Sequence, residues 1–326
     1  MDRLCLEAEE RKEDIVKTLG VNTLYIGGGT PSLLPLPLFH KLIAPLSVFG
    51  PFEEFTIEVN PEDIVEKGEE YVKGLLSLGA NRISMGVQSF DDSILRWMRR
   101  RHNAASARKA FHIIRDAGVN NISIDLIFGV GLQSGQMWAE TINSALELEP
   151  KHISAYQLSI DNGSCLAGIL EKGLYKEAPE ETCRKQYDIL CQEMSDAGYN
   201  HYEVSNFALP GYEAKHNGAY WKRIPYVGLG ASAHSFIGNR RQWNTGALPL
   251  YKSEYEVLDE ENAKMEKLML GLRTSDGLEE EFVRKVCPAD RVEALIKAKA
   301  IVVSQGRIRI PEDHFFVSDD IIREII

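Results

Sequence analysis

Short apolar runs alternate with amphipathic stretches along the first half of the chain. Five runs have strand character, at residues 23–26, 55–59, 82–87, 122–128 and 152–158. The stretches between them, near residues 35–48, 62–78, 91–117 and 135–148, carry apolar residues at helical spacing. Strands that recur about every 25–40 residues with helices between them are typical of βαβ units. The pattern therefore predicts an α/β fold with a parallel sheet or barrel.

The pattern changes after about residue 178. A helix is predicted from Glu180 to Ala197, and an aromatic and polar region with little periodicity continues to Asn244. From residue 260 the order is helix, turn, helix, the short strands IVVSQ and RIRIP, and the helical tail SDDIIREII, which is typical of a winged-helix-like module. We therefore expect three parts: a partial barrel at 1–178, an extension at 179–258 and a winged-helix-like domain at 259–326.

Glycine or polar residues lie at the end of each predicted strand. Gly28 follows the first strand, Glu58, Gln88 and Asp125 lie near the ends of the next three, and Ser159 follows the fifth. In parallel α/β folds, ligands bind at the carboxyl ends of the strands. We therefore expect these five residues to share one site.

The most informative of these strand ends is the run GGGTPS, residues 27–32. Three consecutive glycines remove every Cβ atom at one place, so a ligand or another backbone can approach the main chain closely. Thr30 adds a hydroxyl group beside them. A tight turn without a ligand is the alternative interpretation of this run alone.

Composition and charge exclude several classes of function. The 326 residues carry a net charge of −11, which argues against general affinity for nucleic acid or an anionic membrane. The winged-helix-like part is acidic at residues 279–281 and 319–320, so it is not a predicted nucleic-acid reader either. No apolar run approaches the roughly 20 residues of a transmembrane helix. The first 16 residues read as an amphipathic helix and not as a signal peptide, so we expect a cytoplasmic protein.

The cysteines form no recognisable metal or redox motif. The chain has five, at positions 5, 165, 183, 191 and 287, and no C-x-x-C sequence. Cys183 and Cys191 are eight residues apart, but two thiols alone make a poor metal site. We therefore expect free thiols and no metal ligands.

Eight motifs in one order resemble a known family over nearly the whole chain. They are GGGTPS, EVNPED, RISMGVQSFDDSIL, NISIDLIFG, HISAYQLSI, YEVSNFA, HNGAYW and YVGLGASAHSF. This order is similar to that of the radical S-adenosylmethionine (radical SAM) proteins related to oxygen-independent coproporphyrinogen III oxidase. Within them, HNGAYW (residues 216–221) resembles the HemW-type haem chaperone branch.

The resemblance implies a partial (β/α)6 TIM-like barrel with a C-terminal helical extension, and it implies S-adenosylmethionine and a [4Fe-4S] cluster as cofactors. In the family, a C-x-x-x-C-x-x-C loop after the first barrel strand holds the cluster. This chain has no such loop and starts about one strand and one loop later, so we expect a truncated start. Since three thiolates must supply iron ligands, we expect no cluster in this chain and no reductive cleavage of S-adenosylmethionine.

The resemblance also implies a role for each residue at the strand ends. Gly28, Gly29 and Thr30 would lie against the methionine part of the cofactor. Glu58 would accept hydrogen bonds from its polar groups, although a helix cap is the alternative, and Gln88 would bind a hydroxyl group, although a polar strand end is the alternative.

Two further cofactor residues follow from the same resemblance. Arg100 lies twelve residues after Gln88 and would clamp a carboxylate, with a register uncertain by one because Arg99 and Arg101 flank it. A solvated helix end is the alternative for Arg100. Asp125 lies inside an apolar strand, where a carboxylate is costly unless it is paired, so a ribose or a charge partner is expected. Ser159 would lie beside the adenosine.

The second half of the chain supplies candidate haem residues. An imidazole is a good axial ligand for haem iron, so His216 is the first candidate, and Tyr220 and Trp221 would pack on the macrocycle. The alternative is that HNGAYW forms a structural corner. His234 aligns near a cofactor-contacting position or would be a second ligand, and a satisfied buried histidine is equally compatible.

Three functions are compatible with these residues. The first is a HemW-like haem chaperone that binds haem and hands it to an acceptor protein. The second is oxygen-independent coproporphyrinogen III oxidase, which converts coproporphyrinogen III to protoporphyrinogen IX by oxidative decarboxylation. The third, an unrelated barrel enzyme with a phosphate-binding GGGT loop, leaves the other seven motifs without an explanation. The motif HNGAYW favours the first.

Overall fold

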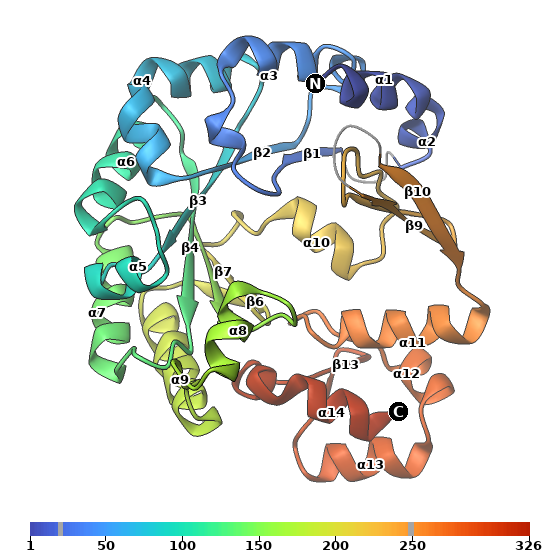
Figure 1. Cartoon of the computed structure of the whole chain (residues 1–326). Helices are drawn as coiled ribbons and strands as arrows, with labels where there is room; N and C mark the ends of the chain where they lie inside the picture. Colours follow the sequence, from blue (N-terminus) through green and yellow to red (C-terminus); the bar gives the residue numbers. More distant parts are fainter. Residues whose placement is uncertain (19–21, 247–250) are drawn as a thin grey trace.

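The computed structural model describes residues 1–18, 22–246 and 251–326. Its centre is a curled sheet of seven strands, ordered β1-β2-β3-β4-β5-β7-β6 (Figure 1). The strands are β1 (Thr23–Ile26), β2 (Glu54–Val59), β3 (Arg82–Gln88), β4 (Asn121–Phe128), β5 (His152–Gln157), β6 (Asn200–Glu203) and β7 (Asn206–Ala208). The pairs from β1 to β5 are parallel, whereas β7 is antiparallel to both β5 and β6. This arrangement confirms the expected partial barrel.

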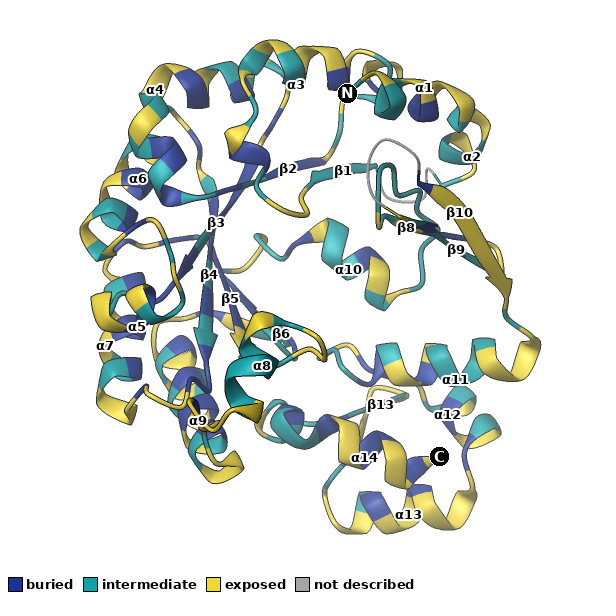
Figure 2. Ribbon diagram, in the orientation of Figure 1, coloured by how far each residue is buried: buried dark blue, intermediate teal, exposed yellow. Residues whose placement is uncertain are grey.

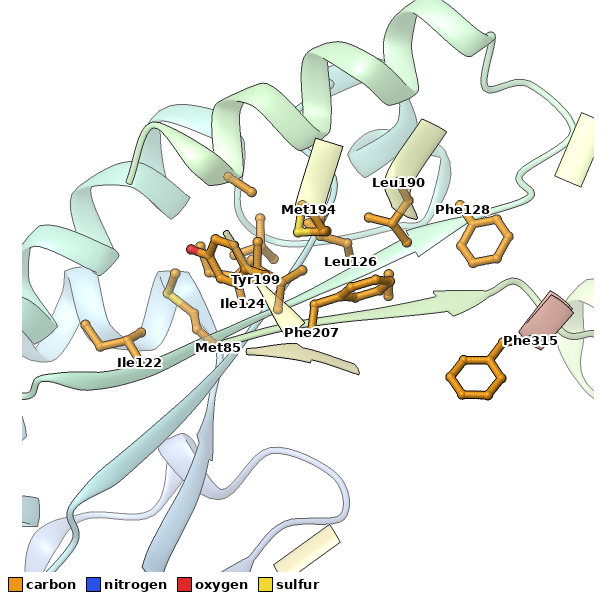
Figure 3. Close-up of a cluster of buried hydrophobic side chains, with 14 of the residues drawn as sticks. Met85, Ile122, Ile124, Leu126, Phe128, Leu190, Met194, Tyr199, Phe207 and Phe315 are labelled. Atoms are coloured by element: carbon orange, nitrogen blue, oxygen red, sulfur yellow. The ribbon is translucent and has the colours of Figure 1, made fainter. Parts of the chain in front are cut away.

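Helices cover the outer face of this sheet. They are α3 (Leu36–Ile43), α4 (Pro61–Ser77), α5 (Asp92–Trp97), α6 (Ala104–Asp116), α7 (Gly135–Leu146) and α9 (Glu180–Asp196), with short 3-10 turns at Pro31–Leu33 and Ser47–Phe49. The short helix α8 (Cys165–Glu171) follows β5 and has no buried residue. Every second strand residue points toward the covering helices. Ile57, Met85, Ile124 and Ile153 are such residues, and all four are fully buried. Figure 2 shows the burial along the strands, and Figure 3 shows Met85 and Ile124 within the core. The main hydrophobic core therefore lies between the strands and the helices.

The inner face of the barrel is polar. The register aligns Glu58 with Ser84, and Ser84 with Ser123, across three neighbouring strands. One step further toward the carboxyl ends, Asp125 pairs with Ser154. Polar side chains on this face leave the lumen suited to a polar ligand.

A second layer closes one side of the barrel opening. It contains α10 (Lys215–Trp221) and a three-stranded sheet of β8 (His234–Ile237), β9 (Arg240–Thr245) and β10 (Lys252–Val257), in the order β10-β9-β8. The chain start packs against it: Glu7, which is buried, accepts hydrogen bonds from the amide of Gly230 (2.9 Å) and from Asn244 Nδ2 (2.8 Å). The start of the chain and the segment 215–257 therefore build this layer together.

The C-terminal part contains α11 (Glu260–Gly271), β11 (Leu278–Glu279), α12 (Glu280–Val286), α13 (Ala289–Lys297), β12 (Val302–Ser304), β13 (Arg307–Arg309), a 3-10 helix (Glu312–Val317) and α14 (Ser318–Ile325). Its sheet has the order β11-β13-β12. Helices followed by a small antiparallel sheet agree with the predicted element order of this region. The boundaries of the three expected parts stay a prediction. Among the described residues, no helix is long and apolar enough to cross a membrane.

The structure corrects two expected helices. The N-terminal helix is divided at Arg11 into α1 (Asp2–Glu10) and α2 (Lys12–Val16). The helical stretch near 91–117 is also two helices, because Asp91 caps the start of α5 and Asn103 caps the start of α6 with their side chains. The strands β6 to β10 were not predicted, since that region carries little alternation.

Candidate functional site

The glycine run after β1 forms an exposed backbone loop that Glu58 holds in place. Glu58 Oε2 accepts a hydrogen bond from the amide of Gly28 (3.1 Å), and Oε1 accepts one from the hydroxyl of Tyr25 (2.7 Å). Gly28 and Gly29 have φ values of +78° and +92°, and a Cβ atom added to either would meet no atom within 4 Å. The loop is therefore open to a ligand, and both oxygens of Glu58 are already engaged in holding it.

Gly27 has a different role from its two neighbours. A Cβ atom added there would lie 2.6 Å from Oε1 of Glu58 and 2.6 Å from the ring of Tyr25. Its missing side chain thus lets the carboxylate reach the loop. Thr30, half-buried, follows the loop, and its Oγ1 accepts a 3.4 Å hydrogen bond from Asn60.

Gln88 ends β3 in a conformation that glutamine rarely adopts. Its φ is +70°, and the pairing between β3 and β4 is irregular between Gly86 and Gln88. Bulges of this kind re-aim side chains and are frequent beside functional sites. Gln88 is 9% exposed, and its side-chain amide makes no hydrogen bond with the residues that the structure describes. Its hydrogen-bonding capacity is therefore available to a ligand.

Asp125 projects from β4 into the polar lumen. Ser84 Oγ lies 3.2 and 3.1 Å from its two carboxylate oxygens. Burial raises the pKa of Asp125, while the hydroxyl of Ser154, the guanidinium of Arg82 and Ser84 oppose that rise. The carboxyl group accepts hydrogen bonds from hydroxyl donors, which is what a ribose diol also offers.

The three consecutive arginines after α5 differ in their partners. Arg101 forms ion pairs with Glu62 (2.7 Å) and Asp63 (2.9 Å). Arg99 is exposed. Arg100 is half-buried, burial lowers its pKa, and within the described ranges it forms no ion pair. Of the three, Arg100 therefore has the guanidinium that is partly desolvated and still free to bind an anion.

A cavity of about 630 Å³ lies between β1 and the second layer. Its volume is within the range of roughly 300–1,000 Å³ that is typical of small-molecule sites. Leu24, Ile26, Gly27 and Gly28 line one side, and α10 and the β8–β9 sheet line the other. Three of the residues predicted from separate motifs, Gly28, His216 and His234, thus face one space.

His216 is fixed at the wall of this cavity by both ring nitrogens. Nδ1 lies 2.7 Å from Thr23 Oγ1, and Nε2 lies 2.7 Å from the hydroxyl of Tyr220. The imidazole also stacks on the ring of Tyr25, with 5.0 Å between the ring centres. Burial is the main cause that lowers the pKa of His216 to about 4. The imidazole is therefore neutral at pH 7.

Helix α10 presents the members of the HNGAYW motif to two different spaces. His216 and Tyr220 are one helical turn apart and face the 630 Å³ cavity. Trp221 lies on the other side, where it lines a larger cavity of about 1260 Å³ together with Lys222. The structure therefore brings Tyr220 but not Trp221 to His216.

The two remaining site predictions lie at the margins. His234, at the start of β8, is exposed and lines the 630 Å³ cavity. Ser159 is exposed beyond the end of β5 and does not line that cavity. Neither residue is anchored by a side-chain hydrogen bond to another described residue.

The cysteines do not supply the donors of an iron–sulfur cluster. Over residues 1–18, 22–246 and 251–326, no group of three or more His, Cys, Asp or Glu side chains is placed to hold a metal ion. Cys183 and Cys287 are buried, Cys165 is exposed, and Cys5 and Cys191 are half-buried. The donor set of this chain therefore does not fit a [4Fe-4S] cluster.

Comparison with known proteins adds independent evidence. The radical SAM superfamily matches residues 6–145. The heme chaperone HemW of Lactococcus lactis is 31% identical in an alignment that covers 94% of this chain and 85% of that protein. HemW of Bacillus subtilis is 35% identical in an alignment that covers 79% of this chain and 71% of that protein. The chain belongs to the HemW family of radical SAM proteins.

The fold of this HemW-family chain also has a counterpart among solved structures. Coproporphyrinogen III oxidase (HemN) from Escherichia coli, a radical SAM enzyme, superposes with a TM-score of 0.77 over 99% of this chain and 82% of that chain. The two sequences are 20% identical, so this likeness concerns the fold. It agrees with the partial barrel and C-terminal extension expected from the sequence.

Sequence reasoning missed several residues that shape the cavity of this HemW-family chain. Thr23 bonds His216, Glu54 accepts hydrogen bonds from the amides of Lys215 (2.7 Å) and His216 (3.1 Å), and Arg223 and Arg241 line the cavity. The excess of polar residues in 53–58 was the one available signal for Glu54. The arginines carried no signal, because the cavity is formed by segments far apart in the sequence.

Proposed function

We propose that this chain binds haem in the 630 Å³ cavity and S-adenosylmethionine at the adjoining strand ends, and that it passes the haem to an acceptor protein. The observation that carries the proposal is that the glycine loop and the HNGAYW helix line one cavity. The name heme chaperone, which the relatives bear, supports the same function.

His216 is the proposed axial ligand of the haem iron. A neutral imidazole carries the lone pair that a metal needs, and a ligating histidine is commonly oriented by a hydrogen bond at its other nitrogen. Thr23 holds Nδ1 in this way, so Nε2 is the proposed iron-binding atom. The hydroxyl of Tyr220 occupies Nε2 and has to move away, and since the side chain is 39% exposed its hydroxyl reaches water instead. His234, across the cavity, is the proposed second ligand.

The strand ends are the proposed S-adenosylmethionine site. The open backbone of Gly28, Gly29 and Thr30 suits the methionine part of the cofactor. Gln88 and Asp125 suit its hydroxyl groups, Arg100 its carboxylate, and Ser159 its adenosine. Glu58 acts by holding the glycine loop, because its carboxylate is already bonded to that loop.

Oxygen-independent coproporphyrinogen III oxidation is the second proposed function, because the E. coli neighbour in fold bears that name. It requires an iron–sulfur cluster, and the described residues include no group of three or more metal-binding side chains that would hold one. Haem binding is the first proposal because its candidate residues line one cavity.

The test is an anaerobic titration of the full chain with haem, followed by Soret absorbance. We expect saturable one-to-one binding that His216→Ala weakens about tenfold or more, as expected for loss of an axial ligand, with a shifted Soret maximum. Iron-free protoporphyrin IX should bind the wild type and His216→Ala alike, because it needs no axial ligand. Trp221→Phe, on the opposite side of α10, is the matched control and should leave haem affinity unchanged.

A second variant keeps the test valid if His216→Ala fails to fold, because it is expected to bind haem more tightly than the wild type. Tyr220→Phe removes the hydroxyl that occupies Nε2, so it should raise haem affinity. An unchanged Soret spectrum in His216→Ala would remove His216 as the ligand. Absence of saturable haem binding by the wild type would overturn the chaperone proposal and make coproporphyrinogen III the next ligand to test.

A further inference from the structure

Two arginines from separate elements reach the wall of the 630 Å³ cavity. Arg223 follows the end of α10, and Arg241 lies on β9. Both guanidinium groups approach one carboxylate, that of Glu266 on α11, which also lines the cavity, and Arg241 forms a second ion pair with Glu256 (2.8 Å). Glu256 does not line the cavity, so the lining itself carries two cationic side chains and one anionic side chain, which suits an anionic ligand.

Arg223 is held in place with unmet hydrogen-bonding capacity. Its Nη2 lies 3.0 Å from Glu266 Oε2, yet Nε, Nη2 and that oxygen are buried without a hydrogen-bond partner among the described residues. Only 16% of the side chain is exposed. Its carbon Cζ lies 4.8 Å from the ring centre of Phe236, which fixes the guanidinium plane beside the cavity. A buried guanidinium with unsatisfied donors is costly unless a ligand completes its hydrogen bonds.

The backbone at Arg223 belongs to the turn that ends α10. Its φ is +52°, and the amides of Arg223 and Ile224 donate hydrogen bonds to the carbonyl oxygens of Tyr220 (3.0 Å) and Ala219 (2.9 Å), as is common where a helix ends. The same turn places Arg223 in the lining of the cavity in which His216 and Tyr220 lie.

We infer that Arg223 and Arg241 bind two carboxylate groups of the cavity's ligand, and that Glu266 occupies these arginines when the ligand is absent. The inference rests on the proposed function, since a haem carries two propionate side chains. A planar guanidinium binds a carboxylate through two parallel hydrogen bonds, which positions the ligand as well as attracting it. The ring system then lies against Leu42, Leu229 and Leu270, with its iron toward His216.

The test compares carboxylate and ester forms of one porphyrin. Haem and haem dimethyl ester are titrated into the wild type, Arg223→Gln and Arg241→Gln. We expect each substitution to weaken haem about tenfold, the magnitude of a lost charge-assisted pair, and to leave the diester unaffected. Arg240→Gln is the matched control, because Arg240 is exposed, bonds Gln242 and does not line the cavity.

Glu266→Gln is expected to increase haem affinity, a result that an unfolded variant cannot produce. Removing the competing carboxylate should raise haem affinity several-fold and leave that of the diester unchanged. Equal wild-type affinity for haem and its diester would overturn the inference without any variant.

Iron-free protoporphyrin IX separates this inference from the proposed function. If haem shows no iron-specific binding but the iron-free dicarboxylate binds and depends on Arg223 and Arg241, the chaperone proposal fails and the arginine assignment stands. If neither porphyrin binds, both are overturned.

Discussion

Substitution of Glu203 by glutamine should change how the stability of this protein depends on pH. Glu203 lies on β6, has no exposed surface, and accepts hydrogen bonds from the amide of Ser205 and from the side chain of Asn206. Burial raises the pKa of its carboxyl group from 4.5 to about 7. At about 1.4 kcal/mol per pKa unit, that rise corresponds to about 3 kcal/mol.

The sign follows from which state holds the proton. Between about pH 4.5 and about pH 7 the unfolded chain has released the Glu203 proton while the folded chain retains it, so the free energy of unfolding falls as pH rises. Glutamine has no such proton. Oδ1 of Asn206 is a buried acceptor without a partner in the described part of the chain. It can therefore accept a hydrogen bond from the side-chain NH2 group of a glutamine at position 203.

Urea unfolding of the wild type and Glu203→Gln at several pH values from about 4.5 to about 8 measures the effect. Relative to the wild type, the variant should gain about 3 kcal/mol across this interval. His201 and His216 have lowered pKa values and act in the opposite direction, but both proteins contain them, so they cancel in the difference. Glu171→Gln, at an exposed position, is the control. A difference that is constant with pH would refute the reasoning.

Three further substitutions test the strand ends. Gln88→Gly relieves the positive φ and should stabilise the fold by about 1 kcal/mol in urea unfolding, while lowering S-adenosylmethionine affinity in calorimetric titration; a loss of stability would contradict the assigned strain. Gly27→Ala places a methyl group against Glu58 and should reduce the same affinity at least tenfold, and retention of wild-type affinity would show that the loop adjusts. Arg100→Ala should weaken the cofactor's binding about tenfold, whereas Arg99→Ala, at the exposed neighbour, should not; the reverse result would shift the register by one.

The sequence predicted the barrel well because its signals are local. Strands β1 to β5 begin and end within about one residue of the predicted runs, since apolar residues on the helix-facing side recur where burial requires them. The break between α5 and α6 was also encoded locally, by the cap at Asn103 that starts α6, and was overlooked. The roles of Gly28, Gln88, Arg100 and Asp125 stay predictions. The backbone of Gly28 is open, and Asp125 already accepts hydrogen bonds from Ser84.

The cavity was beyond sequence reasoning because it depends on contacts between distant segments. That Glu58 accepts hydrogen bonds from Tyr25 and Gly28 depends on the pairing of β1 with β2, which the sequence does not state. His216 and Trp221 belong to one sequence motif, but they lie on opposite sides of α10 and line different cavities. Periodicity does not state which face of a seven-residue helix meets which neighbour.

The distance in sequence between the walls of the cavity governs when it can exist. Thr23 and His216, which touch, are 193 residues apart, and Glu7 and Asn244 are 237 apart. During synthesis the amino-terminal part emerges first, so β1 and its glycine loop wait until most of the chain has left the ribosome. Contacts of such long range close late in folding. The cavity is therefore incomplete while the chain is being synthesised, and a ligand of this cavity binds only after synthesis and folding of these segments are finished.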